Sequence, residues 1–155
     1  MQAIETSRLL LEPLAVQHAE RMFLVLSEPS LHSFLDSGPP SSVAELSERY
    51  ARLEARVSPD GSQLWLNWVL VLPGHGPIGF VQATVVGSTA WIAYLVARPH
   101  WSRGYAVEAT GAMLGHVAST HKVSLFRATA EVANVRSTAL LQRLGFLLGK
   151  LHGAC

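Results

Sequence analysis

Three apolar runs joined by short turns fill the middle of the chain, and they restrict its fold more than any other feature. The runs cover residues 64–72, 78–86 and 90–97. Residues 73–77, rich in glycine and proline, separate the first two, and Gly87-Ser88 separates the second two. Connections of these lengths are typical of β-hairpins. The pattern predicts an antiparallel three-stranded meander, on which the rest of the chain must build its layers.

The flanking segments change from alternation to a period of about 3.6 residues, which indicates helices. Helices are predicted over 15–26, from a capping box at Ser42 and Glu45 onward, over 105–120, and over 135–144 with Gly145 as the C-cap. Short strands are predicted over 8–11, 125–132 and 146–151. The order β-α-α-β-β-β-α-β-α-β predicts an α/β fold with a mixed sheet (α+β), as a single domain over residues 1–155.

Composition and charge exclude several classes of protein. The formal net charge is +1 and the two lysines, Lys122 and Lys150, are far apart, so no basic stripe is available for nucleic acid. No apolar run is long enough to cross a membrane. The single cysteine, Cys155, excludes an internal disulfide framework, and Met1 to Glu5 do not open a signal peptide. These features predict a cytoplasmic protein.

The loop between the third run and the following helix is the strongest candidate for a binding site. It reads Trp101-Ser102-Arg103-Gly104-Tyr105-Ala106. The free N–H groups and the positive dipole end of the helix favour an anion there, and Gly104 would let the backbone approach it closely. The same residues also fit an ordinary strand-to-helix turn that needs a glycine. Neither the dinucleotide-binding Gly-x-Gly-x-x-Gly nor a Walker Gly-Lys-Ser/Thr is present.

Besides this loop, three other motifs occur in a characteristic order and spacing, and the four together span nearly the whole chain. They are an Arg-Leu-x-Leu-x-Pro-like start at 8–13, the pair Ile78-Gly79, the loop and helix start at 101–109, and the segment from Asn134 to Phe146. Together they resemble the GNAT superfamily of acetyl-coenzyme A-dependent N-acetyltransferases, and most closely the branch typified by ribosomal-protein N-terminal acetyltransferases. The resemblance implies a mixed sheet with four helices, splayed open between the third meander strand and the next strand.

The resemblance also implies a co-substrate and its binding residues. Acetyl-coenzyme A would lie in the opening, with its pyrophosphate on the backbone N–H groups of residues 103–106 and its pantetheine arm along residues 95–97. Asn134 would contact the pantetheine amides, and Ser137 would be the catalytic residue, stabilising the leaving thiolate. No metal is implied. The full implied binding set is Leu95, Val96, Ala97, Trp101, Ser102, Arg103, Gly104, Tyr105, Ala106, Asn134 and Ser137.

Several of these side chains have a structural reading as well. Asn134 is a good N-cap for the last helix, and Ser137 would then be its third residue, where it also helps to satisfy the helix end. Glu108 is expected to interact favourably with the N-terminus of its helix rather than to act in catalysis. Trp65 and Trp68 are three apart on one strand, so one should be in the core while the other is free to line an acceptor site.

The chain departs from the family at its catalytic positions. Where some relatives carry a glutamate base on the third meander strand this chain has Trp91, and where many carry a tyrosine acid it has Leu141. No carboxylate occurs between Gly61 and Glu108. His32, His75 and His100 are alternative bases, although each fits an ordinary surface or packing role. A base is unnecessary if the acceptor is an α-amino group, whose own pKa is low.

Two further expectations concern the partners. An amine acceptor is implied, either a protein N-terminus or a small molecule. The chain ends before the last strand that relatives usually have, which predicts an uncovered sheet edge and a homodimer that covers it. The competing hypothesis is a degenerate protein of this fold that binds coenzyme A, or only a protein partner, without catalysis.

Overall fold

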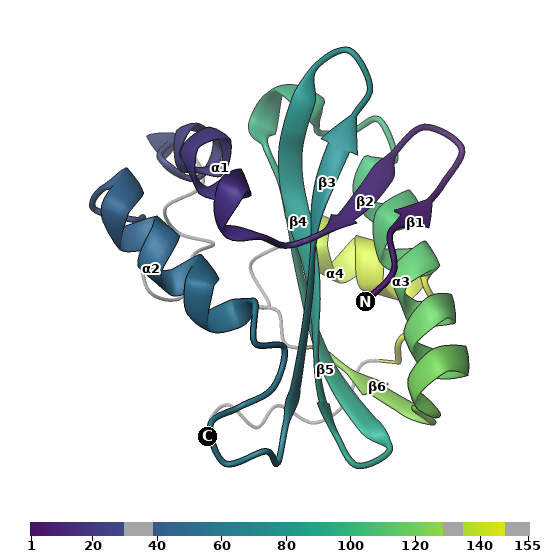
Figure 1. The fold of residues 1–155 in the computed structure, drawn as a ribbon. Coiled ribbons are helices and arrows are strands. Elements are labelled where there is room, and N and C mark those ends of the chain that lie inside the picture. Colours follow the sequence, from purple (N-terminus) through teal and green to yellow (C-terminus); the bar gives the residue numbers. More distant parts are fainter. Residues whose placement is uncertain (30–38, 129–134, 148–155) are drawn as a thin grey trace.

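A mixed sheet forms the centre of the protein (Figure 1). The computed structural model describes residues 1–29, 39–128 and 135–147. In these residues six strands lie in the order β1-β2-β3-β4-β5-β6, and only β5 and β6 pair in parallel. The strands are β1 (Ile4–Glu5), β2 (Leu10–Pro13), β3 (Leu64–Leu72), β4 (Gly76–Val86), β5 (Thr89–Val96) and β6 (Leu125–Arg127).

Helices cover both faces of the sheet, as Figure 1 shows. On one side, called the α1/α2 face, lie α1 (Ala19–Leu26), introduced by the 3-10 turn η1 (Val16–His18), and α2 (Val43–Leu53). On the opposite side, the α3/α4 face, lie α3 (Tyr105–His121) and α4 (Val135–Arg143). A 3-10 turn, η3 (Arg98–His100), leads from β5 toward α3. No helix in the described ranges is long and apolar enough to span a bilayer.

The period of two along β3 divides the core into two clusters. Leu66, Trp68 and Leu70 point toward the α3/α4 face, whereas Val69 points into the cluster beneath α1 and α2. Trp68 is fully buried and its indole N–H donates to the Gln2 carbonyl at 2.9 Å, which ties down the N-terminus. Each side chain of this kind contributes about 1.5–3 kcal/mol by burial. One of Trp65 and Trp68 was expected to lie in the core, and Trp68 is that residue.

The meander and the four helices agree with the sequence-based expectations, and their ends differ by a few residues. The hydroxyl of Ser42 accepts from the Glu45 N–H at 3.0 Å, as a capping box requires, and Gly145 has a φ of +93° at the end of α4. The first helix begins only at Ala19, because residues 16–18 form the 3-10 turn.

The short strands were the least accurate part of the prediction. The first predicted strand is shifted to Leu10–Pro13, and Pro13 ends it as the last paired residue. The two-residue β1 was not predicted, because it carries no alternation of its own. Only 125–127 of the predicted strand 125–132 are in a strand, with 129–134 outside the described residues. Phe146 and Leu147 are not in a strand, and the remainder of that predicted element also lies outside the described part.

Candidate functional site

Among the described residues, β5 and β6 pair over only three positions, which leaves part of the β5 edge unpaired. The paired residues are Thr89 with Leu125, Ala90 with Phe126 and Trp91 with Arg127. In the described part of the chain, β5 then continues to Val96 without a partner strand on that side. Within the described residues, this unpaired stretch agrees with the splay expected between the third meander strand and the next strand.

Backbone groups near Val96 point into this opening. The Ala97 N–H donates to the Ile78 carbonyl on β4 at 2.7 Å, so the alternation of an antiparallel ladder turns the N–H and C=O of Val96 away from β4. The Val96 carbonyl accepts from the Trp101 indole N–H at 2.6 Å. A ligand was expected to contact the backbone of residues 95–97. Among these residues, the Val96 N–H is the donor that points away from β4, toward the unpaired side of β5.

Gly79 allows the unusually close contact between β4 and β5 at this point. A Cβ built on Gly79 would lie 1.9 Å from the Leu95 carbonyl oxygen and 3.0 Å from the Val96 Cα. Both are backbone atoms, which cannot move aside as a flexible side chain can. The Ile78-Gly79 motif is thus explained by the geometry of the β5 backbone at the open edge.

The loop before α3 has a backbone suited to an anion. Ser102 and Gly104 have φ values of +64° and +82°, while Arg103 between them does not have a positive φ. Successive backbone N–H groups in a turn of this kind can form a concave nest that binds anions. Gly104 is the N-cap of α3 and supplies no side-chain cap, so the first N–H groups of the helix stay available. The strained conformation of Ser102 is of the kind that concentrates at functional sites.

A clamp between the N-terminal segment and α3 fixes this loop, and the sequence alone did not reveal it. The Glu108 carboxylate accepts from the Thr6 hydroxyl at 2.5 Å, from the Arg8 backbone N–H at 2.8 Å and from the Arg8 Nε at 2.7 Å. Arg8 also donates through Nη1 to the Arg103 carbonyl at 2.8 Å, and its guanidinium lies 4.4 Å from the centre of the Tyr105 ring. The first and third motifs of the sequence are therefore joined physically.

Glu108 is held ionised by this clamp. Burial alone would raise the pKa of the Glu108 carboxyl, but hydrogen bonds from Thr6 and Arg8 and the Arg8 charge outweigh it, so the pKa lies below its ordinary value of 4.5. A depressed pKa means that the stabilisation is present above the ordinary value and is lost as pH falls through the folded-state pKa.

We expect Glu108→Gln to lower the free energy of unfolding by about 1 kcal/mol, because Arg8 and Thr6 lose a charged acceptor at a partly exposed site. Urea denaturation across pH measures this difference. It should stay constant above pH 4.5 and shrink in more acidic solution, as the wild-type carboxyl is protonated. Glu20→Gln, the same change on an exposed residue of α1, is the control. Identical pH profiles for the two variants would contradict the clamp.

Two histidines considered as bases lie together next to this loop. The rings of His75, in the turn between β3 and β4, and His100, in η3, are 5.6 Å apart, and the His100 ring is 6.3 Å from that of Tyr105. The Nδ1 atom of His100 is buried without a hydrogen-bond partner among the described residues. Burial, reinforced by the charges of His75 and Arg103, lowers the pKa of His100. The His100 ring thus borders the loop before α3, His75 lies behind it, and His32 is outside the described residues.

The remaining predicted site residues are placed in part. The α4 helix begins at Val135, so Ser137 is its third residue, and its side chain and Asn134 lie outside what the structure describes. Leu141 is buried in the core between the sheet and α4. Trp91 is 46% exposed on β5. No group of three His, Cys, Asp or Glu side chains that could hold a metal occurs in residues 1–29, 39–128 and 135–147.

The fold and the loop define an α/β protein in which a strand-to-helix turn with a backbone suited to an anion lies beside the unpaired stretch of β5. Residues 8–147 match the family model described as the acetyltransferase (GNAT) domain. The chain therefore belongs to the GNAT acetyltransferase family. No curated protein sequence matches it.

Solved structures show the same fold at low sequence identity. RimL, a ribosomal L7/L12 α-N-protein acetyltransferase in complex with coenzyme A, is 16% identical with a TM-score of 0.83, over 96% of this chain and 86% of RimL. Mycobacterium smegmatis RimJ, in complex with a coenzyme A disulfide, is 21% identical with a TM-score of 0.78, over 94% and 75%. A chimera of the Vibrio cholerae spermidine N-acetyltransferase SpeG with hSSAT is 18% identical with a TM-score of 0.76, over 93% and 83%.

Proposed function

We propose that this protein transfers the acetyl group of acetyl-coenzyme A to a primary amine, with both substrates bound at once. The observation that carries the proposal is the nest formed by Ser102, Arg103 and Gly104 at the start of α3, directly beside the open edge of β5. The family match and the coenzyme A complexes of RimL and RimJ support it. Residues 1–155 would form one catalytic domain.

In this proposal the backbone does most of the binding. The N–H groups of residues 103–106 hold the pyrophosphate, with Trp101 and Ser102 shaping the loop. The Val96 N–H bonds the pantetheine arm as an added strand would, next to Leu95 and Ala97. Asn134 contacts the same arm, and Ser137 donates a hydrogen bond to the sulfur as negative charge develops there.

The reaction needs a neutral amine, and the three meander strands offer it no carboxylate base. The amine nitrogen attacks the thioester carbonyl carbon, the carbon–sulfur bond breaks, and the proton lost by the nitrogen passes to the leaving thiolate, directly or through water. The strands β3, β4 and β5 contain no Asp or Glu. An α-amino group has a pKa of about 7.7–8.0 and is partly neutral at pH 7, so it needs less help than a lysine-like amine with a pKa near 10.4. A protein or peptide N-terminus is therefore the preferred acceptor.

The experiment is to follow free thiol release from acetyl-coenzyme A in the presence of peptides with free N-termini, and to identify the product by mass spectrometry. We expect thiol release that depends on the peptide, and one acetyl group on its α-amine. The competing possibility is binding without turnover, which Trp91 and Leu141 at the family's usual base and acid positions favour. Tight binding of acetyl-coenzyme A with no thiol release for any amine would establish that alternative.

A further inference from the structure

A row of aromatic and cationic side chains crosses the α1/α2 face below the helices. Trp65 on β3, Thr84 on β4, Trp91 on β5 and Arg127 on β6 are paired in register, one after the other. The Arg127 guanidinium lies 5.7 Å from the centre of the Trp91 ring, which remains 46% exposed. We call these four residues the Trp–Arg row. An exposed indole held beside a guanidinium is a surface that can stack on a ligand and bind an anion.

A second row lies between the Trp–Arg row and the open end of β5. It consists of Asn67, Gln82 and Ala93, again paired in register. Asn67 is only 8% exposed, yet neither its amide nor that of Gln82 hydrogen-bonds another residue in the described ranges. Gln82 is half-buried, and neither amide is fully enclosed, so both can hydrogen-bond a ligand that brings donors and acceptors of its own. A peptide backbone is such a ligand.

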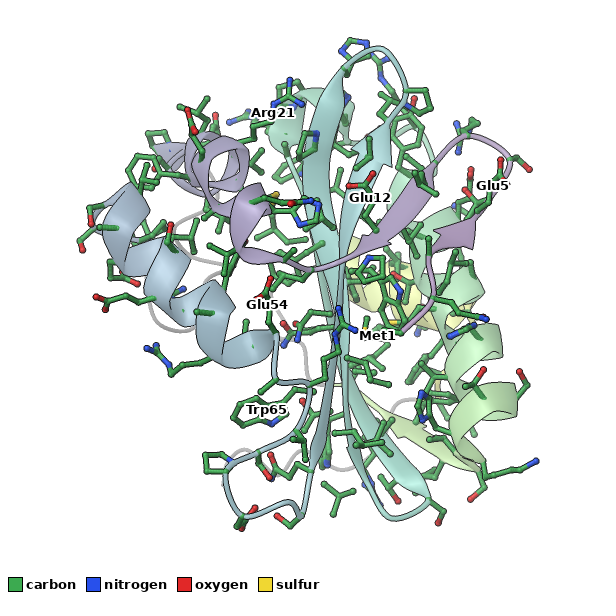
Figure 2. The ribbon with its side chains drawn as sticks, viewed as in Figure 1. Met1, Glu5, Glu12, Arg21, Glu54 and Trp65 are labelled. Carbon is green, nitrogen blue, oxygen red and sulfur yellow. The ribbon has the colours of Figure 1, made fainter. Side chains whose placement is uncertain are left out.

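A hollow continues the Trp–Arg row toward α2. Its volume is about 390 Å³, and Trp65 and Arg52 are among its lining residues. Figure 2 shows Trp65 on the α2 side of the sheet, below Glu54. The Glu54 carboxylate accepts from the Val16 N–H, and the Asp60 carboxylate accepts from Ser58 and Ser62 in its own turn. Among the described residues of the Trp–Arg row and of this hollow, the charged side chains are therefore Arg127 and Arg52.

We propose that the acceptor is a peptide N-terminus that carries an acidic side chain within its first four residues, bound by Arg127. This inference rests on the proposed function, in which the pantetheine arm runs along residues 95–97, and it takes the thioester at the end of that arm to lie near Leu95. Trp91 and Leu95 are four residues apart on β5, or about 13 Å at 3.3 Å per residue. About four extended peptide residues span that distance, with their backbone over Asn67 and Gln82. A polyamine acceptor, by contrast, would meet a cation here.

The test compares two C-terminally amidated peptides, Ser-Ala-Ala-Asp-Ala-Ala and Ser-Ala-Ala-Asn-Ala-Ala, with spermidine as a polycation. Steady-state kinetics and calorimetric binding in the presence of coenzyme A are measured for wild type, Arg127→Gln and Arg143→Gln. Arg143 is exposed on α4, across the sheet from the row, and is the charge-matched control. Acetyl-coenzyme A affinity is measured for each variant, so that loss of the fold or of the cofactor site is recognised.

We expect wild type to prefer the Asp peptide by about fivefold in kcat/KM, chiefly through KM, since Arg127 is exposed and water screens a charge pair there. Arg127→Gln should bring that ratio to about one, and Arg143→Gln should leave it unchanged. Three results would overturn the inference while acetyl transfer stands. They are equal kcat/KM values for the two peptides with wild type, a kcat/KM ratio that Arg127→Gln leaves unchanged, and a preference for spermidine.

Absence of all turnover would instead defeat the proposed function. Calorimetric binding would then decide the inference by itself. Tighter binding of the Asp peptide that Arg127→Gln abolishes would support the site, and equal binding of the two peptides would overturn it.

Discussion

Gly104→Glu is expected to weaken acetyl-coenzyme A binding by at least about hundredfold, because it puts a carboxylate where the proposed nest receives the pyrophosphate. Gly104 has a φ of +82°, and a Cβ there would lie 3.2 Å from Arg8 Nη2. Any side chain therefore strains the backbone by about 1 kcal/mol and presses on the clamp, so Gly104→Ala should cost about tenfold in affinity. Calorimetric titration measures both variants.

Gly61→Glu is the matched control for this prediction. Gly61 has a φ of +78°, and a Cβ added there would meet no atom within 4 Å. The variant therefore brings the same charge and a similar backbone strain at a position far from the loop in sequence. It should bind acetyl-coenzyme A like wild type. If Gly104→Glu also retained wild-type affinity, the pyrophosphate would have to bind elsewhere.

Gly79→Ala is expected to destabilise the fold by about 3 kcal/mol, which is the upper part of the usual range for overpacking a filled site. The added methyl group would lie 1.9 Å from the Leu95 carbonyl oxygen, so the β4 and β5 backbones must separate. The displacement would also move the Val96 N–H, and acetyl-coenzyme A affinity should fall with stability. Urea denaturation gives the first quantity and calorimetry the second.

Gly115→Ala provides the comparison for the same chemical change. Gly115 is exposed on α3, and a Cβ there meets nothing within 4 Å. Alanine favours the helix, so this variant should gain about 0.5–1 kcal/mol. Equal stabilities for Gly79→Ala and Gly115→Ala would show that the close approach of β4 and β5 is not as described.

The parts of the fold that sequence reasoning found were those set by local periodicity. The three meander strands alternate between two buried faces, so Trp65 and Trp68 were assigned to opposite sides from their spacing. The capping by Ser42 and the end of α4 at Gly145 were recognised because each needs only a few adjacent residues.

The parts that it missed depend on residues far apart in the chain. Glu108 was expected to act on the N-terminus of its own helix, whereas its carboxylate is bonded to Thr6 and Arg8, about a hundred residues earlier. Hydrophobic periodicity cannot predict a contact between residues so far apart in the chain. The only indication in the sequence was that Arg8 and Glu108 both belong to motifs that resemble the GNAT superfamily. The pairing of Trp91 with Arg127 was missed for the same reason, since it depends on the parallel register of β5 and β6.

The central claim is that backbone N–H groups of the loop and of β5 hold acetyl-coenzyme A. Titration of the ¹⁵N-labelled protein with acetyl-coenzyme A, followed by amide NMR, tests this most directly. We predict the largest shifts at the amides of Arg103, Gly104, Tyr105 and Ala106, together with Val96. Binding that leaves these amides unchanged, or no binding at millimolar acetyl-coenzyme A, would contradict the account.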